Sequence, residues 1–212
     1  MNKNENLHVF NHPLINHKIA ILRDVNTGTK EFREIVEEIA CIMAYEAFRD
    51  VPTKTVEVQT PLEKTEQTMI QEDKIVIVPI LRAGLGMVNG IHNVLPIARV
   101  GHIGMYRDEE TFQPKEYYAK FPENIDDKIA ILLDPMLATG GSACAAIDAL
   151  KKRGVKKIKL MSIIGAPVGV EKVTSTHPDV QVYLATLDRE LNANKYILPG
   201  LGDAGDRIFG TK

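Results

Sequence analysis

Four short, almost wholly apolar runs constrain the fold of this chain more than any other feature of its sequence. They read IVIVPIL at residues 75–81, IAILL at 129–133, IKLMSII at 158–164 and VQVYLATL at 180–187. Runs of this length without regular polar alternation are typical of strands that are covered on both faces, as in a parallel sheet.

Helical patterns lie between these runs and before the first of them. Residues 84–95, 142–152 and 168–175 each follow an apolar run, and residues 30–48 place apolar side chains at the spacing of an amphipathic helix. Strand, loop and helix repeated in this order predict an α/β fold, a doubly wound and mostly parallel sheet flanked by helices. We expect residues 1–212 to form a single domain, because no repeat or linker-like change of composition interrupts them.

Composition excludes several classes of protein. The formal net charge is −2, so there is no overall basic field to favour nucleic acid or an anionic membrane surface. Cys41 and Cys144 lack the spacing of a disulfide framework or a metal site, which favours a reducing compartment. The polar first residues lack a signal-peptide core, and no apolar run is long enough to span a bilayer. We therefore expect a cytoplasmic protein with no membrane partner.

The segment DPMLATGGS, residues 134–142, carries the strongest chemical signal. It follows the second apolar run and precedes a helical pattern, and ligands of such sheets bind beyond the carboxyl ends of the strands. Adjacent glycines let the backbone approach a phosphate, and the helix N-terminus adds a favourable partial charge. Thr139 and Ser142 add hydroxyl donors, and either one is a candidate helix cap. The Asp134 carboxylate is suited to accept hydrogen bonds from ribose hydroxyls, so the segment predicts a ribose-5-phosphate site.

The glycine-rich segments also have simpler or different interpretations. Thr-Gly-Gly-Ser alone is typical of an ordinary capped turn between a strand and a helix, and only the longer run is specific. No GxxxxGK[ST] sequence is present, which excludes a Walker A loop. Residues 84–90 read GLGMVNG, where the third glycine comes one residue too late for a dinucleotide fingerprint.

Two arginines are candidates for binding a diphosphate. Arg82 directly follows the first apolar run, where a guanidinium beside backbone N–H groups can hold a diphosphate by paired hydrogen bonds. Its alternative role is a surface ion pair. Arg107 precedes a polar stretch that continues to about Phe121, and we expect this stretch to close over substrate as a lid. A solvated hairpin is the alternative for that stretch.

The segment YILPGLGDAGDR, residues 196–207, combines three glycines and a proline, which predicts a tightly shaped, irregular backbone. Such a backbone is suited to read a planar base through its N–H and C=O groups. Taken alone, the segment is equally typical of a structural turn near the end of a chain.

Together these segments closely resemble the uracil phosphoribosyltransferases, which belong to the type I phosphoribosyltransferase superfamily. The resemblance covers nearly the whole chain and includes HPLINHKIAILR, VPILRAGLGM, GMYRDEET, DPMLATGGS and YILPGLGDAGDRIFGTK. It implies that the chain transfers the ribose-5-phosphate of phosphoribosyl pyrophosphate (PRPP) to uracil, giving UMP and diphosphate in pyrimidine salvage. It also implies a small hood, formed with the terminal segments, and a protruding loop or β-arm.

The resemblance implies roles for the residues that match the family's motifs. Arg82 and Arg107 would contact PRPP, mainly at its diphosphate. The ribose and the 5-phosphate would be held by Asp134, Pro135, Met136, Leu137, Ala138, Thr139, Gly140, Gly141 and Ser142. Backbone groups of Ile197, Gly202 and Ala204 would read uracil. Asp203 would lie between the base and PRPP, and it joins Asp134 and Arg107 in the predicted catalytic set.

The resemblance also bears on cofactors and assembly. The wider superfamily usually has two adjacent acids at the start of the PRPP loop, whereas Pro135 takes the second place here, as in the uracil branch. We therefore expect no direct metal ligand and a Mg²⁺ ion carried by PRPP. Arg207 stands at a position where some relatives have lysine, so the positive charge at this position is retained. A homodimer or higher homo-oligomer is implied, with GTP as a candidate effector.

Three other functions were considered from the sequence. A purine salvage transferase of the same fold would need a pocket for a bicyclic ring, which the tail segment argues against. An RNA-binding regulator is disfavoured because the chain has no basic stripe. A pseudoenzyme that only binds UMP is disfavoured because all the expected substrate-facing positions are filled.

Overall fold

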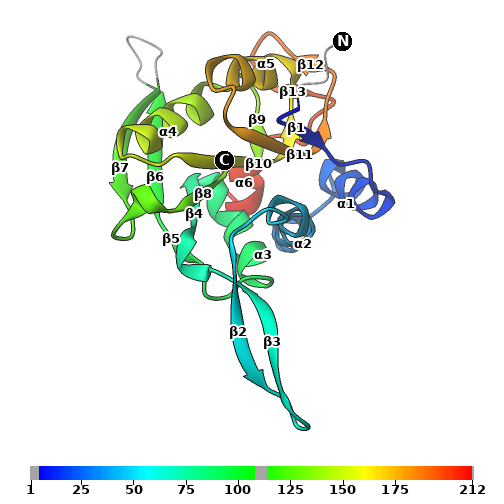
Figure 1. Cartoon of the computed structure of the whole chain (residues 1–212). Helices are drawn as coiled ribbons and strands as arrows, with labels where there is room; N and C mark the ends of the chain where they lie inside the picture. Colours follow the sequence, from blue (N-terminus) through cyan, green and yellow to red (C-terminus); the bar gives the residue numbers. More distant parts are fainter. Residues whose placement is uncertain (1–4, 108–113, 212) are drawn as a thin grey trace.

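The computed structural model describes residues 5–107 and 114–211. Its main feature is a twisted sheet whose strands follow the spatial order β1-β11-β10-β8-β4-β6-β7 (Figure 1). In that order the strands are Leu7–Val9, Gln181–Leu187, Lys157–Gly165, Ile129–Leu133, Ile75–Leu81, His102–Arg107 and Pro114–Lys120. All neighbours in this path pair in parallel except β6 and β7, which are antiparallel. Two short strands, β5 (Arg99–Val100) and β9 (Met136–Leu137), pair with β4 and β10.

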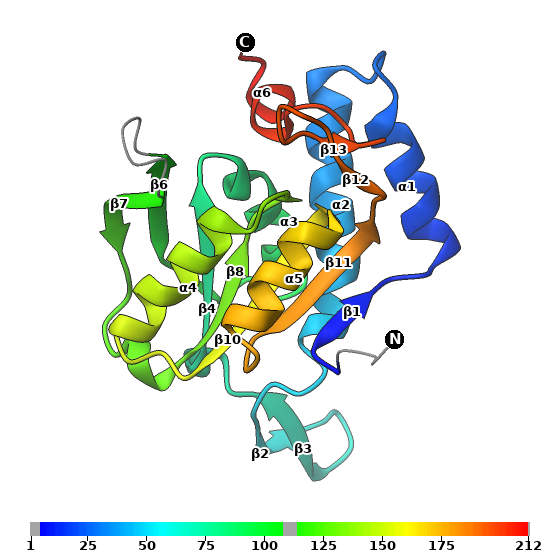
Figure 2. The same cartoon turned by 90° about the horizontal axis from the view of Figure 1, so that it is seen from above.

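Helices cover both faces of the sheet (Figure 2). One face carries α1 (Pro13–Arg23), α2 (Thr29–Ala47), α3 (Val88–His92) and α6 (Ala204–Phe209), and the other carries α4 (Gly141–Lys152) and α5 (Pro167–Thr176). Alternate residues of β4 therefore enter different cores. Ile75 and Ile77 pack in the cluster that contains α2, while Val76 and Val78 pack in the cluster that contains α4. Burial on both sides explains why the strand sequences are apolar without alternation.

The predicted fold class is confirmed, and the four apolar runs correspond to β4, β8, β10 and β11. The expected helix at residues 84–95 is wrong in its extent. The structure has a short 3₁₀ helix, Ala83–Met87, followed by the single turn of α3. Three glycines within this stretch explain the difference, because glycine lowers the propensity for a regular α-helix.

Two further pairs of strands and two short 3₁₀ helices complete the fold. Strands β2 (Thr53–Gln59) and β3 (Lys64–Ile70) form an antiparallel hairpin that projects from the body of the molecule as an arm (Figure 1). Near the carboxyl ends of the sheet, β12 (Glu190–Leu191) pairs with β13 (Ile197–Leu198) next to α6. The 3₁₀ helices span Glu72–Lys74 and Ile125–Asp127.

Candidate functional site

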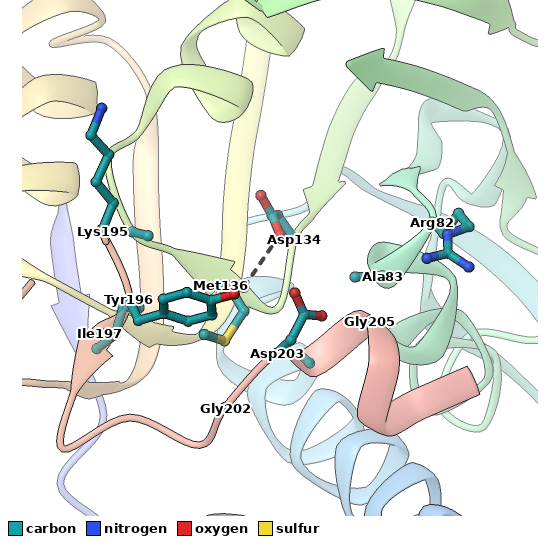
Figure 3. Close-up of a pocket in the computed structure, with 12 residues that line it drawn as sticks. Arg82, Ala83, Asp134, Met136, Lys195, Tyr196, Ile197, Gly202, Asp203 and Gly205 are labelled. Atoms are coloured by element: carbon teal, nitrogen blue, oxygen red, sulfur yellow. Dashed lines mark hydrogen bonds between the residues drawn. The ribbon is translucent and has the colours of Figure 1, made fainter. Parts of the chain in front are cut away.

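A cavity of about 360 Å³ opens between the carboxyl end of β8 and the C-terminal segment of the chain (Figure 3). Its walls come from the loop after β4, the loop after β8 and the tail that leads into α6. It is lined by Arg82, Ala83, Asp134, Met136, Ala138, Lys195, Tyr196, Ile197, Gly202, Asp203, Ala204 and Gly205. The tail residues predicted to read a base therefore lie around the same cavity as Asp134 and Arg82.

A smaller hollow of about 100 Å³ adjoins this cavity and is formed by the loop between β8 and α4. It is lined by Asp134, Met136, Leu137, Ala138, Thr139, Gly140, Gly141, Ser142 and Ala143. Asp134, Met136 and Ala138 line both spaces, so the hollow and the cavity adjoin at the end of β8. Of the predicted loop residues, Pro135 is buried outside both, and its carbonyl oxygen accepts a hydrogen bond from the Ile164 N–H group (3.0 Å).

Asp134 occupies the junction of the two spaces. Its backbone N–H group donates to the Met161 carbonyl oxygen (3.2 Å), which continues the pairing of β8 with β10 beyond the end of the strand. Its side chain accepts a hydrogen bond from the Met136 N–H group (3.3 Å) and points into the cavity. Burial raises the pKa of Asp134 from its ordinary value of 3.8 to about 6, although the hydrogen bond from Met136 lowers it. The carboxyl group is therefore poorly hydrated, which suits a group that exchanges water for a ligand hydroxyl.

The loop that forms the small hollow leads directly into the first turn of α4. Gly140 is the N-cap residue of this helix and has a φ angle of +75°. A Cβ atom at Gly140 would lie 2.8 Å from the carbonyl oxygen of Gly169, so both its conformation and its surroundings require glycine. The expectation that Thr139 or Ser142 caps the helix is wrong, because no side chain caps its start in the described residues. The first N–H groups of α4 are left to face a ligand.

The tail loop follows β13 and has a non-repetitive backbone. The Leu198–Pro199 peptide bond is cis, and both Gly200 and Gly202 have positive φ angles. Asp203 ends the loop as the N-cap of α6, where its Oδ1 atom accepts the Asp206 N–H group (2.9 Å). This hydrogen bond orients the Asp203 carboxylate, which points toward the same space as that of Asp134 (Figure 3).

Of the two arginines predicted to bind the diphosphate, the structure describes the side chain of only one. Arg82 lies at the cavity wall, with 61% of its side chain exposed; its guanidinium lies 3.9 Å from an Asp206 carboxylate oxygen and 5.8 Å from the centre of the Phe209 ring. An exposed ion pair of this length is weak, so the guanidinium can turn to an anionic ligand. Arg107 is the last residue of β6, and its side chain lies outside what the structure describes, as do residues 108–113 of the predicted lid.

Sequence reasoning did not assign roles to four residues that line the cavity, Ala83, Lys195, Tyr196 and Gly205. The ring of Tyr196 lies across the cavity near Met136 and Asp203, and the neighbouring residue Lys195 has a positive φ angle of 66° (Figure 3). Both residues lie in the segment that connects β12 to β13. The only signal in the sequence was the position of Tyr196 at the head of the glycine-rich tail, which does not distinguish a cavity wall from an exposed ring.

Two further features concern residues 5–107 and 114–211, the part of the chain that the structure describes. That part of the chain contains no group of three or more histidine, cysteine, aspartate or glutamate side chains placed to hold a metal ion. Among the helices of the same residues, none is both long and apolar enough to cross a bilayer.

Comparison with known proteins defines first the class and then the family. A solved adenine phosphoribosyltransferase from Trypanosoma brucei matches the structure with a TM-score of 0.58 at 12% identity, over 86% of this chain and 84% of that one. A protein of Aquifex aeolicus matches with a TM-score of 0.91 at 37% identity, over 96% and 97% of the two chains. The fold is therefore that of the phosphoribosyltransferases.

The sequence comparisons identify the family within this class. The family model "Uracil phosphoribosyltransferase" matches residues 9–211. Uracil phosphoribosyltransferases of Geobacillus kaustophilus and Bacillus cereus are each 58% identical over 206 residues, which is 97% of this chain and 99% of those proteins. The chain belongs to the uracil phosphoribosyltransferase family, as its motifs predicted.

Proposed function

We propose that this chain joins uracil to the ribose-5-phosphate of PRPP, releasing diphosphate and forming UMP, and that the two adjoining spaces at the end of β8 are its substrate sites. The observation that carries the proposal is the position of Asp134 between them. The small hollow, with its glycines and open helix N-terminus, suits the 5-phosphate. The larger cavity, bordered by the tail loop, suits the base and the diphosphate.

The proposed mechanism assigns electrostatic roles to the cavity side chains. Cleavage of the bond between C1 of the ribose and the diphosphate passes through an oxocarbenium-like transition state, as in glycoside cleavage. Asp134 binds the ribose hydroxyls and places negative charge near the cationic sugar, and Arg82 and Arg107 stabilise the departing diphosphate. The expected Mg²⁺ ion would neutralise diphosphate charge when it is bound with PRPP. The ion would be held by the phosphate oxygens of PRPP, without a direct ligand from the protein.

Base recognition is assigned to the backbone of the tail. Ile197, Gly202 and Ala204 line the cavity, and their neighbouring peptide groups present N–H and C=O groups at fixed positions. A carbonyl oxygen matched to N3–H of uracil, and an N–H group matched to O4, would meet cytosine with the wrong polarity. Mispaired buried polar groups lower specificity constants by a factor of about 10⁴ or more, so cytosine is expected to be a very poor substrate.

Asp203 is proposed to act beside the reacting nitrogen of uracil. Its Oδ1 atom accepts the Asp206 N–H group, which fixes the carboxylate at the cavity wall. In this position it can either accept the proton lost from uracil or orient the base and PRPP. Residual activity and its pH profile in an Asp203→Asn variant separate these two roles.

The remaining proposals concern assembly and regulation and rest on the family resemblance. We propose a single domain, residues 1–212, whose terminal segments form the hood and the uracil loop, acting in the cytoplasm as a homodimer or higher homo-oligomer. GTP is proposed as an effector. Sedimentation of the purified protein tests its assembly, and a GTP titration at a PRPP concentration well below saturation tests activation.

The purified protein is expected to form UMP from uracil and PRPP in a Mg²⁺-dependent reaction. A competition assay that offers uracil, cytosine, hypoxanthine and orotate together, with PRPP consumption and nucleotide products measured by chromatography, checks this. UMP should be the dominant product. Formation of a purine nucleotide, or PRPP hydrolysis that no base redirects, would contradict the proposed substrate.

Replacing Arg107 by alanine is expected to raise the KM for PRPP about tenfold, with a smaller effect on the KM for uracil. The reason is the loss of a charge-assisted hydrogen bond to the diphosphate, which is worth roughly 1.5–3 kcal/mol. Steady-state kinetics with each substrate varied in turn measure both constants. An unchanged dependence on PRPP would count against the predicted role of Arg107.

A further inference from the structure

The last turn of α1 meets the tail loop at a buried ion pair whose function the substrate roles above do not explain. Arg23 ends α1, and its guanidinium contacts both carboxylate oxygens of Asp188, the residue after β11. Both partners also bond to Gly200 in the tail: Arg23 Nη1 donates to its carbonyl oxygen (2.7 Å), and Asp188 Oδ2 accepts its N–H group (2.8 Å). The ion pair thus satisfies both polar groups of one residue of the loop.

We propose that Arg23 and Asp188 are positioning residues that hold the tail loop in the shape that reads uracil. This inference rests on the proposed function, because it assumes that the tail loop binds the base. Arg23 lies far from both partners in the sequence, 165 residues from Asp188 and 177 from Gly200, whereas Asp188 and Gly200 are 12 residues apart. The ion pair therefore fixes the loop against the helix and the sheet, not against its own neighbours.

The ion pair between Arg23 and Asp188 is largely buried, so its charges need close hydrogen-bonding partners. The Asp188 side chain is 3% exposed and that of Arg23 is 24% exposed, and Gly200 is buried beside them. A carboxylate removed from water must be paired and hydrogen-bonded, because an uncompensated buried charge is strongly destabilising. The Asp188 backbone is itself fixed, since its N–H group donates to the Gly165 carbonyl oxygen (2.8 Å) at the end of β10. The anchor of the loop is therefore the rigid end of the sheet.

The conformation of Gly200 explains why both of its polar groups need a partner. Its φ angle is +70°, and a Cβ atom there would overlap the carbonyl oxygen of Ile197. A glycine of this kind has many alternative conformations, so side chains outside the loop must select one. The cavity residues Ile197 and Gly202 lie on either side of Gly200, and a rotation of its peptide units would displace the groups proposed to read the base. Small displacements of positioning groups are costly in catalysis.

A second arginine supports the same end of α1. Arg207 in α6 donates to the carbonyl oxygens of Leu22 (2.5 Å), Leu201 (2.8 Å) and Asp24 (2.7 Å), and its guanidinium lies 4.3 Å from the centre of the Phe32 ring. The C-terminal turn of α1 is thus bonded to the tail on both sides of Gly202. These contacts between α1 and the tail loop give a function to the HPLINHKIAILR motif. The motif ends in Arg23 and contributes no side chain to the cavity lining.

The decisive variant is Arg23→Lys, which keeps the charge opposite Asp188 but cannot bond at once to both carboxylate oxygens and to Gly200. We expect the KM for uracil to rise about tenfold or more and the preference for uracil over cytosine to fall, while the KM for PRPP changes less than about twofold. Asp188→Asn is a second variant with the same expected pattern, in case the first is unstable. Thermal unfolding checks that each variant is folded at the assay temperature.

A matched control removes a similar contact at the opposite end of the sheet. Lys159 is buried, pairs with Asp50 and donates to the Ala47 carbonyl oxygen (2.7 Å), so Asp50→Asn weakens a comparable ion pair away from the cavity. It should lower the unfolding temperature without changing either KM. If Asp50→Asn raises the KM for uracil as much as Arg23→Lys does, the effect is general destabilisation and the positioning role is overturned.

Tyr196→Ala separates failure of this inference from failure of the proposed site. Tyr196 is 50% exposed and lines the cavity, so removal of its ring should raise the KM for uracil at little cost in stability. If Tyr196→Ala raises the KM for uracil and Arg23→Lys does not, the cavity binds the base and the positioning role is wrong. If neither variant affects uracil, the tail loop does not read the base and both the site assignment and this inference fall.

Discussion

Replacing Asp134 by asparagine is expected to reduce UMP formation by a factor of about 100 to 1,000 while the fold is retained. The carboxylate lies at the junction of the proposed phosphate hollow and the base cavity. Asparagine has nearly the same shape and can still accept the Met136 N–H group, so packing is preserved. What is lost is the negative charge beside the developing positive charge on the sugar. Radiochemical or chromatographic measurement of kcat for UMP formation checks this result.

The same substitution is expected to stabilise the ligand-free protein at alkaline pH. The pKa of Asp134 is about 6 in the folded protein and 3.8 ordinarily, so the folded state binds this proton more tightly than the unfolded state. Well below pH 4 both states are protonated and the group has no effect. Stability is lost as pH rises from about 4 to about 6, and the full deficit remains above that range. Asp134→Asn should therefore be more stable than the native protein by on the order of 2–3 kcal/mol at pH 8, with a much smaller difference at pH 4.

Two measurements make this prediction specific. Denaturant unfolding of the native and variant proteins at pH 8 and pH 4 tests the sign of the stability change. Asp126→Asn is a matched control, because Asp126 is exposed near the amino end of β8, whereas Asp134 follows its carboxyl end. The control should leave kcat unchanged. Near-normal turnover of Asp134→Asn would refute the assignment of this carboxylate to the ribose.

The sequence predicted the central sheet well because each strand carries its own signal. Ile75–Leu81 and Ile129–Leu133 are buried on both faces, and this burial is written locally as an uninterrupted apolar run. The candidate site was predictable for a related reason. Residues at the carboxyl ends of parallel strands share one edge of the sheet, so Arg82 and Asp134 were expected together before their positions were known.

The contacts that sequence reasoning missed are those between distant segments. Nothing local to Arg23 indicates that it will bond to Gly200, because the partners come from opposite ends of the chain and meet only after the sheet has formed. The predicted side-chain cap of α4 is wrong for a different reason. Thr139 and Ser142 have suitable side chains, but the left-handed conformation of Gly140 sets the start of α4 without them. The conformation of the loop, and not the capping preference of single residues, therefore determines where α4 begins.

Replacing Gly140 by alanine is expected to lower kcat/KM for PRPP about 100-fold, the second large effect in this protein. At a φ angle of +75° an alanine is strained by roughly 1–2 kcal/mol, and its Cβ atom would lie 2.8 Å from the Gly169 carbonyl oxygen. The loop must shift to relieve this contact. A shift of about 1 Å in a positioning loop costs about a factor of 100 in rate. Steady-state kinetics with PRPP varied at saturating uracil measure the loss.

Gly154→Ala is the matched control, because Gly154 lies just beyond the other end of α4 with a φ angle of +86°. A Cβ atom there would lie 3.0 Å from the side chain of Asp126, far along the helix from the phosphate hollow. Both variants carry similar backbone strain, so both should unfold at lower denaturant concentration than the native protein. Only Gly140→Ala should lose its affinity for PRPP. An equal loss in Gly154→Ala would mean that strain in α4 at large, and not the shape of the phosphate loop, limits the reaction.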